Sequence, residues 1–156
     1  MSVNMNDKSK VVNLCDYPVS WIRKTSTGDE WIKANGSTVI VNSELEVQKD
    51  NGNKFIIGSD GLGSHASVYI ENEELREQFG FDSKEDKRKQ LIVDDDKCKY
   101  ILELKTPASF KKNLEENIIT EQEKMKIMNV ARKIKLDEFS KIQTLEEYTG
   151  MSFKPE

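Results

Sequence analysis

The chain has 156 residues, with 24 basic and 28 acidic side chains and a net charge of −4. Its length predicts one domain or two small ones, and its acidic balance argues against a general polyanion binder. No apolar run approaches the roughly 20 residues that span a bilayer, and the polar N-terminus does not resemble a signal peptide. We therefore expect a soluble, cytoplasmic protein with no membrane association.

Short strand-like segments separated by turn residues fill residues 11–70, after a polar stretch at 1–10 that we predict to be a flexible tail. The turn signals recur every 8–12 residues or so, as in antiparallel sandwiches and small barrels. Asn35-Gly36 is a strong two-residue hairpin signal. We predict an antiparallel β subdomain, either a small barrel or sandwich-like. Its predicted strands are 11–15, 19–24, 30–34, 38–41, 44–48, 55–57 and 66–70.

Helix signals replace strand signals at 71–150, and 151–156 is predicted to be a second tail. Polar N-cap residues precede apolar positions at helical spacing, and Thr120 with Glu123 forms a capping box. The other predicted caps are Asn72, Thr106 and Asp137, with Gly80 and Gly150 as C-terminal stops. A further helix is predicted to start within 94–96. We predict a helical subdomain packed on the β subdomain. The whole is an α+β fold, an N-terminal antiparallel sheet followed by a C-terminal bundle of short helices.

The last two predicted helices are separated only by Leu136 and Asp137, which raises a helix-turn-helix interpretation. A DNA-recognition helix needs cations and base-reading amides or guanidinium groups. The exposed face of the second helix instead carries Glu138, Glu146 and Glu147 against one lysine. Sequence-specific DNA binding is therefore disfavoured, and this acidic face suits a basic protein partner.

A glycine-rich loop at 58–65 has the composition of a ligand site. Its polar side chains are Ser59, Asp60, Ser64 and His65. Phosphate loops lead into a helix and carry a lysine, whereas this loop leads into a strand and has none. The alternative interpretation is a turn whose glycines adopt left-handed conformations.

His65 is the only histidine, so catalysis would have to be built around it. A Ser–His–Asp triad would need Ser59 or Ser64 and a distant carboxylate. A Cys–His pair would need Cys15 or Cys98, and both lie among apolar neighbours that predict buried, reduced thiols. A transition-metal site needs more histidines or clustered cysteines. We predict no enzymatic activity, no metal and no cofactor.

Trp21 and Trp31 lie on neighbouring predicted strands. They could form an aromatic contact for a partner or a stacking platform for bases, or they could be core residues, and the sequence leaves this open. Residues 107–149 could also pack internally or form a homo-oligomer. The apolar side chains concerned are Phe110, Leu114, Met125 and Met128.

Residues 11–19, VVNLCDYPV, resemble the opening "V-x-N-L-[TC]-x-x-x-V" of many small phage and prophage proteins. The resemblance covers these nine residues and carries no catalytic motif and no functional residue. It implies a phage or mobile-element accessory protein, a class rich in inhibitors of host machinery. We therefore expect a non-enzymatic binding protein that inhibits or modulates a host protein machine by protein–protein contact, for example as an anti-defence inhibitor. The alternative is a small β-barrel module that binds a nucleotide or other small ligand at 58–65.

Overall fold

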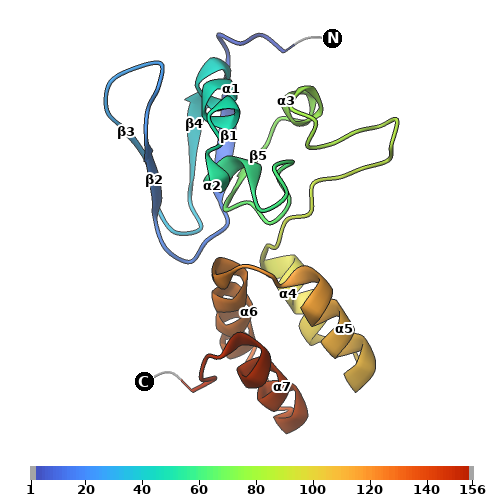
Figure 1. Cartoon of the computed structure of the whole chain (residues 1–156). Coiled ribbons are helices and arrows are strands. Elements are labelled where there is room, and N and C mark those ends of the chain that lie inside the picture. The colour runs from blue at the N-terminus through green and yellow to red at the C-terminus, as the bar shows by residue number, and fades with distance from the viewer. Residues whose placement is uncertain (1–2, 155–156) are drawn as a thin grey trace. The chain divides into compact units, whose positions relative to one another are not determined.

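The computed structural model describes residues 3–154 and shows an α+β protein, which confirms the predicted fold class (Figure 1). The chain forms two compact units that divide between Ile92 and Val93. The described strands all lie in the first unit and do not close into a barrel. The predicted boundary at residue 70 falls inside this unit, because Leu75 and Phe81 beyond it are buried in the same core as the strands. None of the helices between residues 3 and 154 is long and apolar enough to cross a bilayer.

The strands of the first unit form two small antiparallel sheets. Strand β1 (Lys8–Asn13) lies between β4 (Ser37–Val41) and β5 (Val68–Ile70) in a three-stranded sheet. Strands β2 (Val19–Ile22) and β3 (Asp29–Ile32) pair only with each other in a hairpin. Strand β4 is consequently an edge strand of the larger sheet.

Two predicted strands, 44–48 and 55–57, are helices instead. Helix α1 (Asn42–Asp50) and helix α2 (Lys54–Ile57) cover one face of the three-stranded sheet (Figure 1). Within α1 the buried residues include Leu45 and Gln48, which are three apart and therefore share one helix face. The strand-like alternation of 44–48 is too short to distinguish a period of 2 from one of 3.6, and its Glu, Leu and Gln residues favour a helix.

The Asn35-Gly36 turn forms, but it does not close a hairpin. Asn35 adopts a left-handed φ of 55° and the Gly36 amide donates to the Lys33 carbonyl. The strands on either side pair with other partners, β3 with β2 and β4 with β1. The turn therefore carries the chain from one sheet to the other.

A buried asparagine joins the two sheets. The Asn13 side-chain amide, in β1, donates to the carbonyls of Tyr17 (2.9 Å), Ile32 (3.1 Å) and Lys33 (3.1 Å), and its Oδ1 accepts from the Cys15 amide. Only 1% of Asn13 is exposed. Because a buried polar group costs free energy unless it is hydrogen-bonded, these bonds fix the start of β2 and the end of β3 beside β1.

The predicted N-terminal tail is largely structured. Lys8 begins β1, and Val3 and Met5 pack against the core of the first unit. Apolar residues at isolated positions in a polar stretch gave no periodic signal. Met1 and Ser2 lie outside the described residues.

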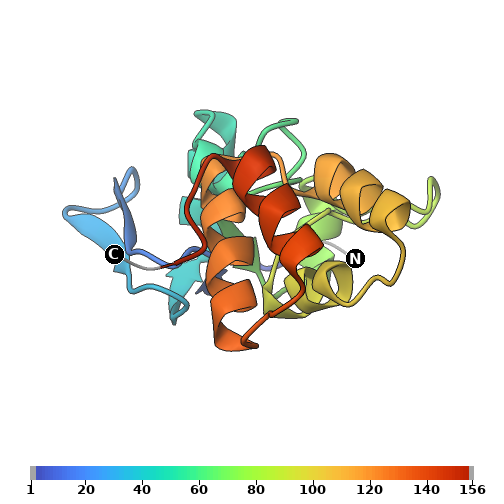
Figure 2. The same cartoon turned by 90° about the horizontal axis from the view of Figure 1, so that it is seen from below.

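The second unit contains four described helices around its own core. They are α4 (Asp95–Leu102), α5 (Pro107–Asn117), α6 (Glu121–Lys133) and α7 (Phe139–Thr149), and α6 lies beside α7 (Figure 2). Short α3 (Glu73–Gln78) belongs to the first unit. The side chains of Asn72, Thr106 and Thr120 accept from backbone amides at the helix starts, and Thr120 forms the capping box with Glu123, as predicted. Within the predicted helix start at 94–96, the cap is Asp94.

The predicted cap of α7 is wrong. Its N-cap position is Glu138, whose side chain makes no capping bond, and not Asp137. Gly150 does end α7 in a left-handed conformation, with φ of 72°. The chain after it is held by Arg132, which donates to the carbonyls of Ser152 and Phe153, so 151–154 is not a loose tail. Pro155 and Glu156 lie outside the described residues.

Of the apolar residues considered for an oligomer contact, three are buried in the second unit. Phe110, Leu114 and Met128 are at most 2% exposed, whereas Met125 is 37% exposed. The first three therefore pack internally. Oligomerisation through 107–149 stays a prediction that only the surface of these helices could support.

Replacing Thr120 by alanine should lower the free energy of unfolding of the second unit by about 1 kcal/mol, since a lost N-cap bond typically costs this much. Asp137→Ala is the matched control and should change it by less than about 0.5 kcal/mol. Urea unfolding followed by far-UV circular dichroism measures both. Equal losses would show that Asp137, not Glu138, caps α7.

Candidate functional site

The β2–β3 hairpin presents its two tryptophans on opposite faces. In its register Trp31 lies opposite Ser20, and Trp21 lies opposite Glu30. Successive side chains of a strand alternate between faces. Trp21 therefore points into the core, where it is 9% exposed and stacks on Phe55 with ring centroids 6.1 Å apart. This settles Trp21 as a core residue and excludes a stacking platform built from both rings.

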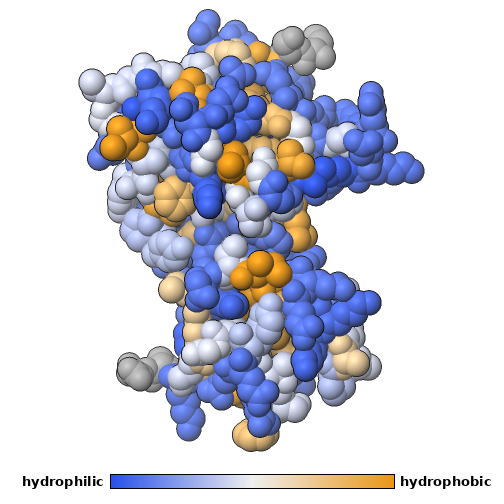
Figure 3. All heavy atoms as spheres, in the orientation of Figure 1, coloured by the Kyte–Doolittle hydropathy of each residue, from blue (hydrophilic) through white to orange (hydrophobic). Residues whose placement is uncertain are grey.

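The outer face of the hairpin carries an exposed apolar pair. Trp31 is 60% exposed and Ile22 is 69% exposed. They are diagonal neighbours across β2 and β3, close enough for an aromatic ring and an aliphatic chain to act together. The remaining residues of this face are Ser20 and Asp29. The surface view shows a small hydrophobic area on the side of this hairpin, together with other hydrophobic areas on the same view (Figure 3).

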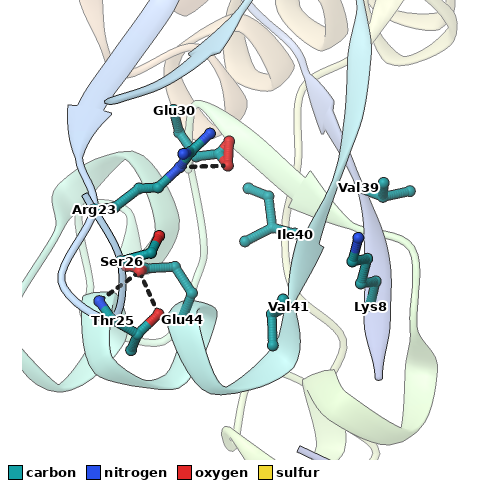
Figure 4. A pocket seen from close by; sticks show the side chains of 9 residues that line it. All are labelled: Lys8, Arg23, Thr25, Ser26, Glu30, Val39, Ile40, Val41 and Glu44. Carbon is teal, nitrogen blue, oxygen red and sulfur yellow. Dashed lines mark hydrogen bonds and ion pairs between the residues drawn. The ribbon is translucent and has the colours of Figure 1, made fainter. Parts of the chain in front are cut away.

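A buried carboxylate anchors the loop of the hairpin to helix α1. Glu44 accepts from the Thr25 amide (2.8 Å) and from the Thr25 hydroxyl (2.7 Å) (Figure 4). It also accepts from the Lys24 amide (3.0 Å) and from the Gln48 side-chain amide (2.8 Å). Gln48 also donates to the Ile22 carbonyl. Only 3% of Glu44 is exposed. The hairpin is thereby held rigidly where it leaves β2.

These hydrogen bonds set the charge of Glu44. Burial by itself would raise the pKa of this carboxyl, but the donors from Thr25, Gln48 and Lys24 outweigh burial and lower the pKa below its ordinary value. Glu44 is therefore ionised at neutral pH. Its oxygens are taken by these donors, so its role is to hold the loop.

A pocket of about 220 Å³ lies between this hairpin and strand β4 (Figure 4). Its lining residues are Lys8, Arg23, Thr25, Ser26, Glu30, Val39, Ile40, Val41 and Glu44. On the hairpin side Arg23 Nε donates to Glu30 at 3.2 Å and Arg23 Nη1 to the Thr27 carbonyl at 3.2 Å. The opposite wall is the side of β4.

The glycine-rich loop at 58–65 is closed by its own polar groups and by an arginine from the charged run that follows. Asp60 Oδ1 accepts from the amides of Leu62 (2.8 Å) and Ser64 (3.1 Å). Arg88 Nη2 donates to Asp60 Oδ2 (3.1 Å), to the Leu62 carbonyl (3.1 Å) and to the Ser64 hydroxyl (3.3 Å). Burial would raise the pKa of Asp60, but the bonds from Leu62, Arg88 and Ser64 lower it.

Most backbone amides of this loop are engaged within the protein. The Ser59 amide donates to Ser64, that of Gly63 to Ile57, and that of His65 to Leu91. His65 itself has a left-handed φ of 61°. At Gly63 a Cβ atom would lie 2.7 Å from the Gln90 side-chain nitrogen, so this glycine serves close packing. The geometry favours the structural interpretation of the loop over a nucleotide cradle.

The thiols considered for catalysis are both buried and unbridged. Burial raises the pKa of Cys98 to about 12, which leaves it without the thiolate character of a nucleophile. Within residues 3–154, no three His, Cys, Asp or Glu side chains are grouped so that they could hold a metal ion.

The three carboxylates proposed on α7 do not share one face. At about 100° per residue, Glu138 and Glu147 lie on opposite sides of the helix. Glu138 pairs with Lys141 at 3.3 Å, and Glu146 accepts from the Phe153 amide at 3.0 Å. Two of the three side chains thus have internal contacts, and charge on this helix alone defines no binding surface.

Sequence reasoning missed Arg88, Glu44 and Ile22. Arg88 lies in a strongly charged segment, residues 83–90, that carries no site motif, and Glu44 lies in a segment, 44–48, that was predicted to be a strand. Only the position of Ile22 carried a signal, since it alternates with Trp21 in β2 and must face away from it.

A comparison with known protein families, with curated proteins and with solved structures finds no match to this chain.

Replacing Glu44 by glutamine should destabilise the first unit by about 2 kcal/mol at pH 7, because hydrogen bonds to a charged group are worth about 1.5–3 kcal/mol. The folded pKa of Glu44 is lowered, so its stabilisation is complete above the unfolded pKa near 4.5 and is lost as the pH falls through the folded pKa. The difference in the free energy of unfolding between the wild type and the variant should therefore become smaller below about pH 4.5. Urea unfolding at several pH values measures this, with Glu46→Gln on the same helix as the control. A stability difference that does not change with pH would show that the charge of Glu44 does not stabilise the fold.

Replacing Arg88 by alanine should speed hydrogen exchange of the amides of Leu62 and Ser64, because the Asp60 carboxylate and the loop carbonyl lose their shared donor. The neighbouring exposed Lys89→Ala is the matched control and should leave exchange unchanged. Exchange followed by NMR gives the comparison. Equal protection in both variants would show that the loop does not depend on Arg88.

Proposed function

We propose that this chain is a non-enzymatic binding protein that acts by protein–protein contact through the outer face of the β2–β3 hairpin. The observation that carries the proposal is the pair of exposed apolar side chains, Trp31 and Ile22, on one face of a rigidly held hairpin. Tryptophan is enriched among the few residues that dominate binding energy at protein interfaces. A core role for Trp31 is excluded by its exposure.

The anchoring of the hairpin supports the proposal. Association costs free energy wherever a loop must be ordered on binding. Here the loop is already fixed by Glu44 and the strands by Asn13. Trp31 therefore meets a partner without a large ordering cost.

The chemistry of the outer face defines the partner that fits it. An apolar cleft would cover Trp31 and Ile22, and a cation at its border would meet Asp29, which lies opposite Ile22 on the same face. This replaces helix α7 as the basis for expecting a basic partner surface. A host protein machine, reached by a phage or mobile-element product, is the partner that the resemblance of residues 11–19 implies, and it stays part of the proposal together with a cytoplasmic site of action.

The test is capture of bacterial lysate proteins on the immobilised chain at low and moderate salt, followed by affinity measurement for each retained protein. Trp31→Ala should weaken the affinity about 30-fold, which corresponds to about 2 kcal/mol for an aromatic anchor. Tyr100→Ala is the matched control, since Tyr100 is an aromatic residue of similar exposure (58%) on α4. A partner that binds both variants equally, or no partner even at low salt, would refute the proposal.

A further inference from the structure

Strand β4 has an open hydrogen-bonding edge. On its other side β4 pairs with β1. The hydrogen bonds at the two ends of this ladder join the Asn13 amide to the Gly36 carbonyl and the Asn42 amide to the Asp7 carbonyl, each at 2.8 Å. Bonded and non-bonded pairs alternate along an antiparallel ladder. Thr38 and Ile40 therefore direct their backbone groups to β1. The N–H and C=O of Val39 point to the other side, where the sheet has no further strand among the described residues.

This edge lacks the features that usually block strand addition. Proteins protect exposed edges with charged side chains, proline or bulges. Strand β4 reads Ser-Thr-Val-Ile-Val, with no charge and no proline. Val39, at its centre, is 57% exposed.

The pocket described above runs along this edge. Val39, Ile40 and Val41 form one wall, and the hairpin loop and the Arg23–Glu30 pair form the other (Figure 4). A strand placed here would thus be bordered on both sides. It would also cover Val39, which otherwise faces solvent.

The exposed charge of the pocket is positive. Its two carboxylates are largely shielded from solvent, since Glu44 is buried under hydrogen-bond donors and the Glu30 side chain is 12% exposed and paired with Arg23. The Arg23 side chain is 35% exposed, and Lys8 is exposed next to Val41 in the sheet register. An occupant with carboxylate side chains would meet both cations.

From these observations we infer that the edge of β4 binds an extended acidic peptide segment of a partner protein by strand addition. The backbone of the segment exchanges hydrogen bonds with Val39, and its carboxylates lie near Lys8 and Arg23. This site is separate from the outer face that carries Trp31, so the inference goes beyond the proposed function. An experiment can refute the peptide site on β4 without refuting binding through Trp31, and the reverse also holds.

The probe is a capped peptide of alternating valine and glutamate, compared with a peptide of alternating valine and lysine, each titrated into the full chain and followed by NMR. The acidic peptide should bind about tenfold more tightly, because its carboxylates meet two exposed cations and each exposed ion pair raises affinity about two- to fivefold. On binding, the Val39 amide should become protected from hydrogen exchange. Lys8→Glu should weaken binding of the acidic peptide several-fold.

Val39→Pro removes the N–H that the added strand would use and spares the bonds between β4 and β1, because proline is tolerated at edge positions whose N–H faces solvent. It should abolish binding, whereas Val39→Thr should retain it. If the proline variant fails to fold by circular dichroism, the protection of the Val39 amide in the wild type decides the question.

Three outcomes would overturn the inference. The first is equal binding of both peptides, and the second is binding that leaves the Val39 amide unprotected. The third is protection of that amide at high protein concentration without peptide, which would assign the edge to a second copy of the chain.

Discussion

The N-terminal unit depends on how two small sheets that share no ladder are held side by side. Backbone bonds stabilise each sheet internally, but the connection between them relies on buried side chains. Asn13 in β1 binds carbonyls at the start of β2 and just after β3, and Glu44 in α1 binds the amides of the loop between those strands. Both groups are almost fully buried and fully bonded. Removing either partner would leave polar atoms without water or protein to bond, which is the costly case for a buried group.

This connection also defines the surfaces that could bind a partner. It fixes the hairpin so that Trp21 fills the core and Trp31 faces outward, and it keeps the hairpin loop across the pocket from β4. By contrast, the glycine-rich loop and the α7 carboxylates direct much of their polar capacity inward, to Arg88, Lys141 and the chain after α7. Groups that already have such partners gain less from an external ligand.

The sequence predicts best those features that depend on neighbouring residues. The capping box at Thr120 and the cap at Thr106 were identified because a cap binds amides two or three positions away. Helix α1 was mistaken for a strand, since five residues around Leu45 fit both periods and the deciding contacts come from the sheet beneath. The closing of the 58–65 loop by Arg88 joins residues far apart in the chain, and no local pattern signals it. The β2–β3 register places Trp21 and Trp31 on opposite faces of the hairpin. The sequence alone does not give this register, so it could not show which of the two tryptophans is exposed.

Each unit contains one buried thiol, Cys15 in the first and Cys98 in the second. A thiol that is enclosed by apolar side chains cannot be alkylated until its surroundings open. The rate at which a maleimide or iodoacetamide reagent modifies each cysteine therefore reports the opening of its own unit. The chain thus has a natural, site-resolved gauge of whether its two halves unfold together or independently, without any introduced label.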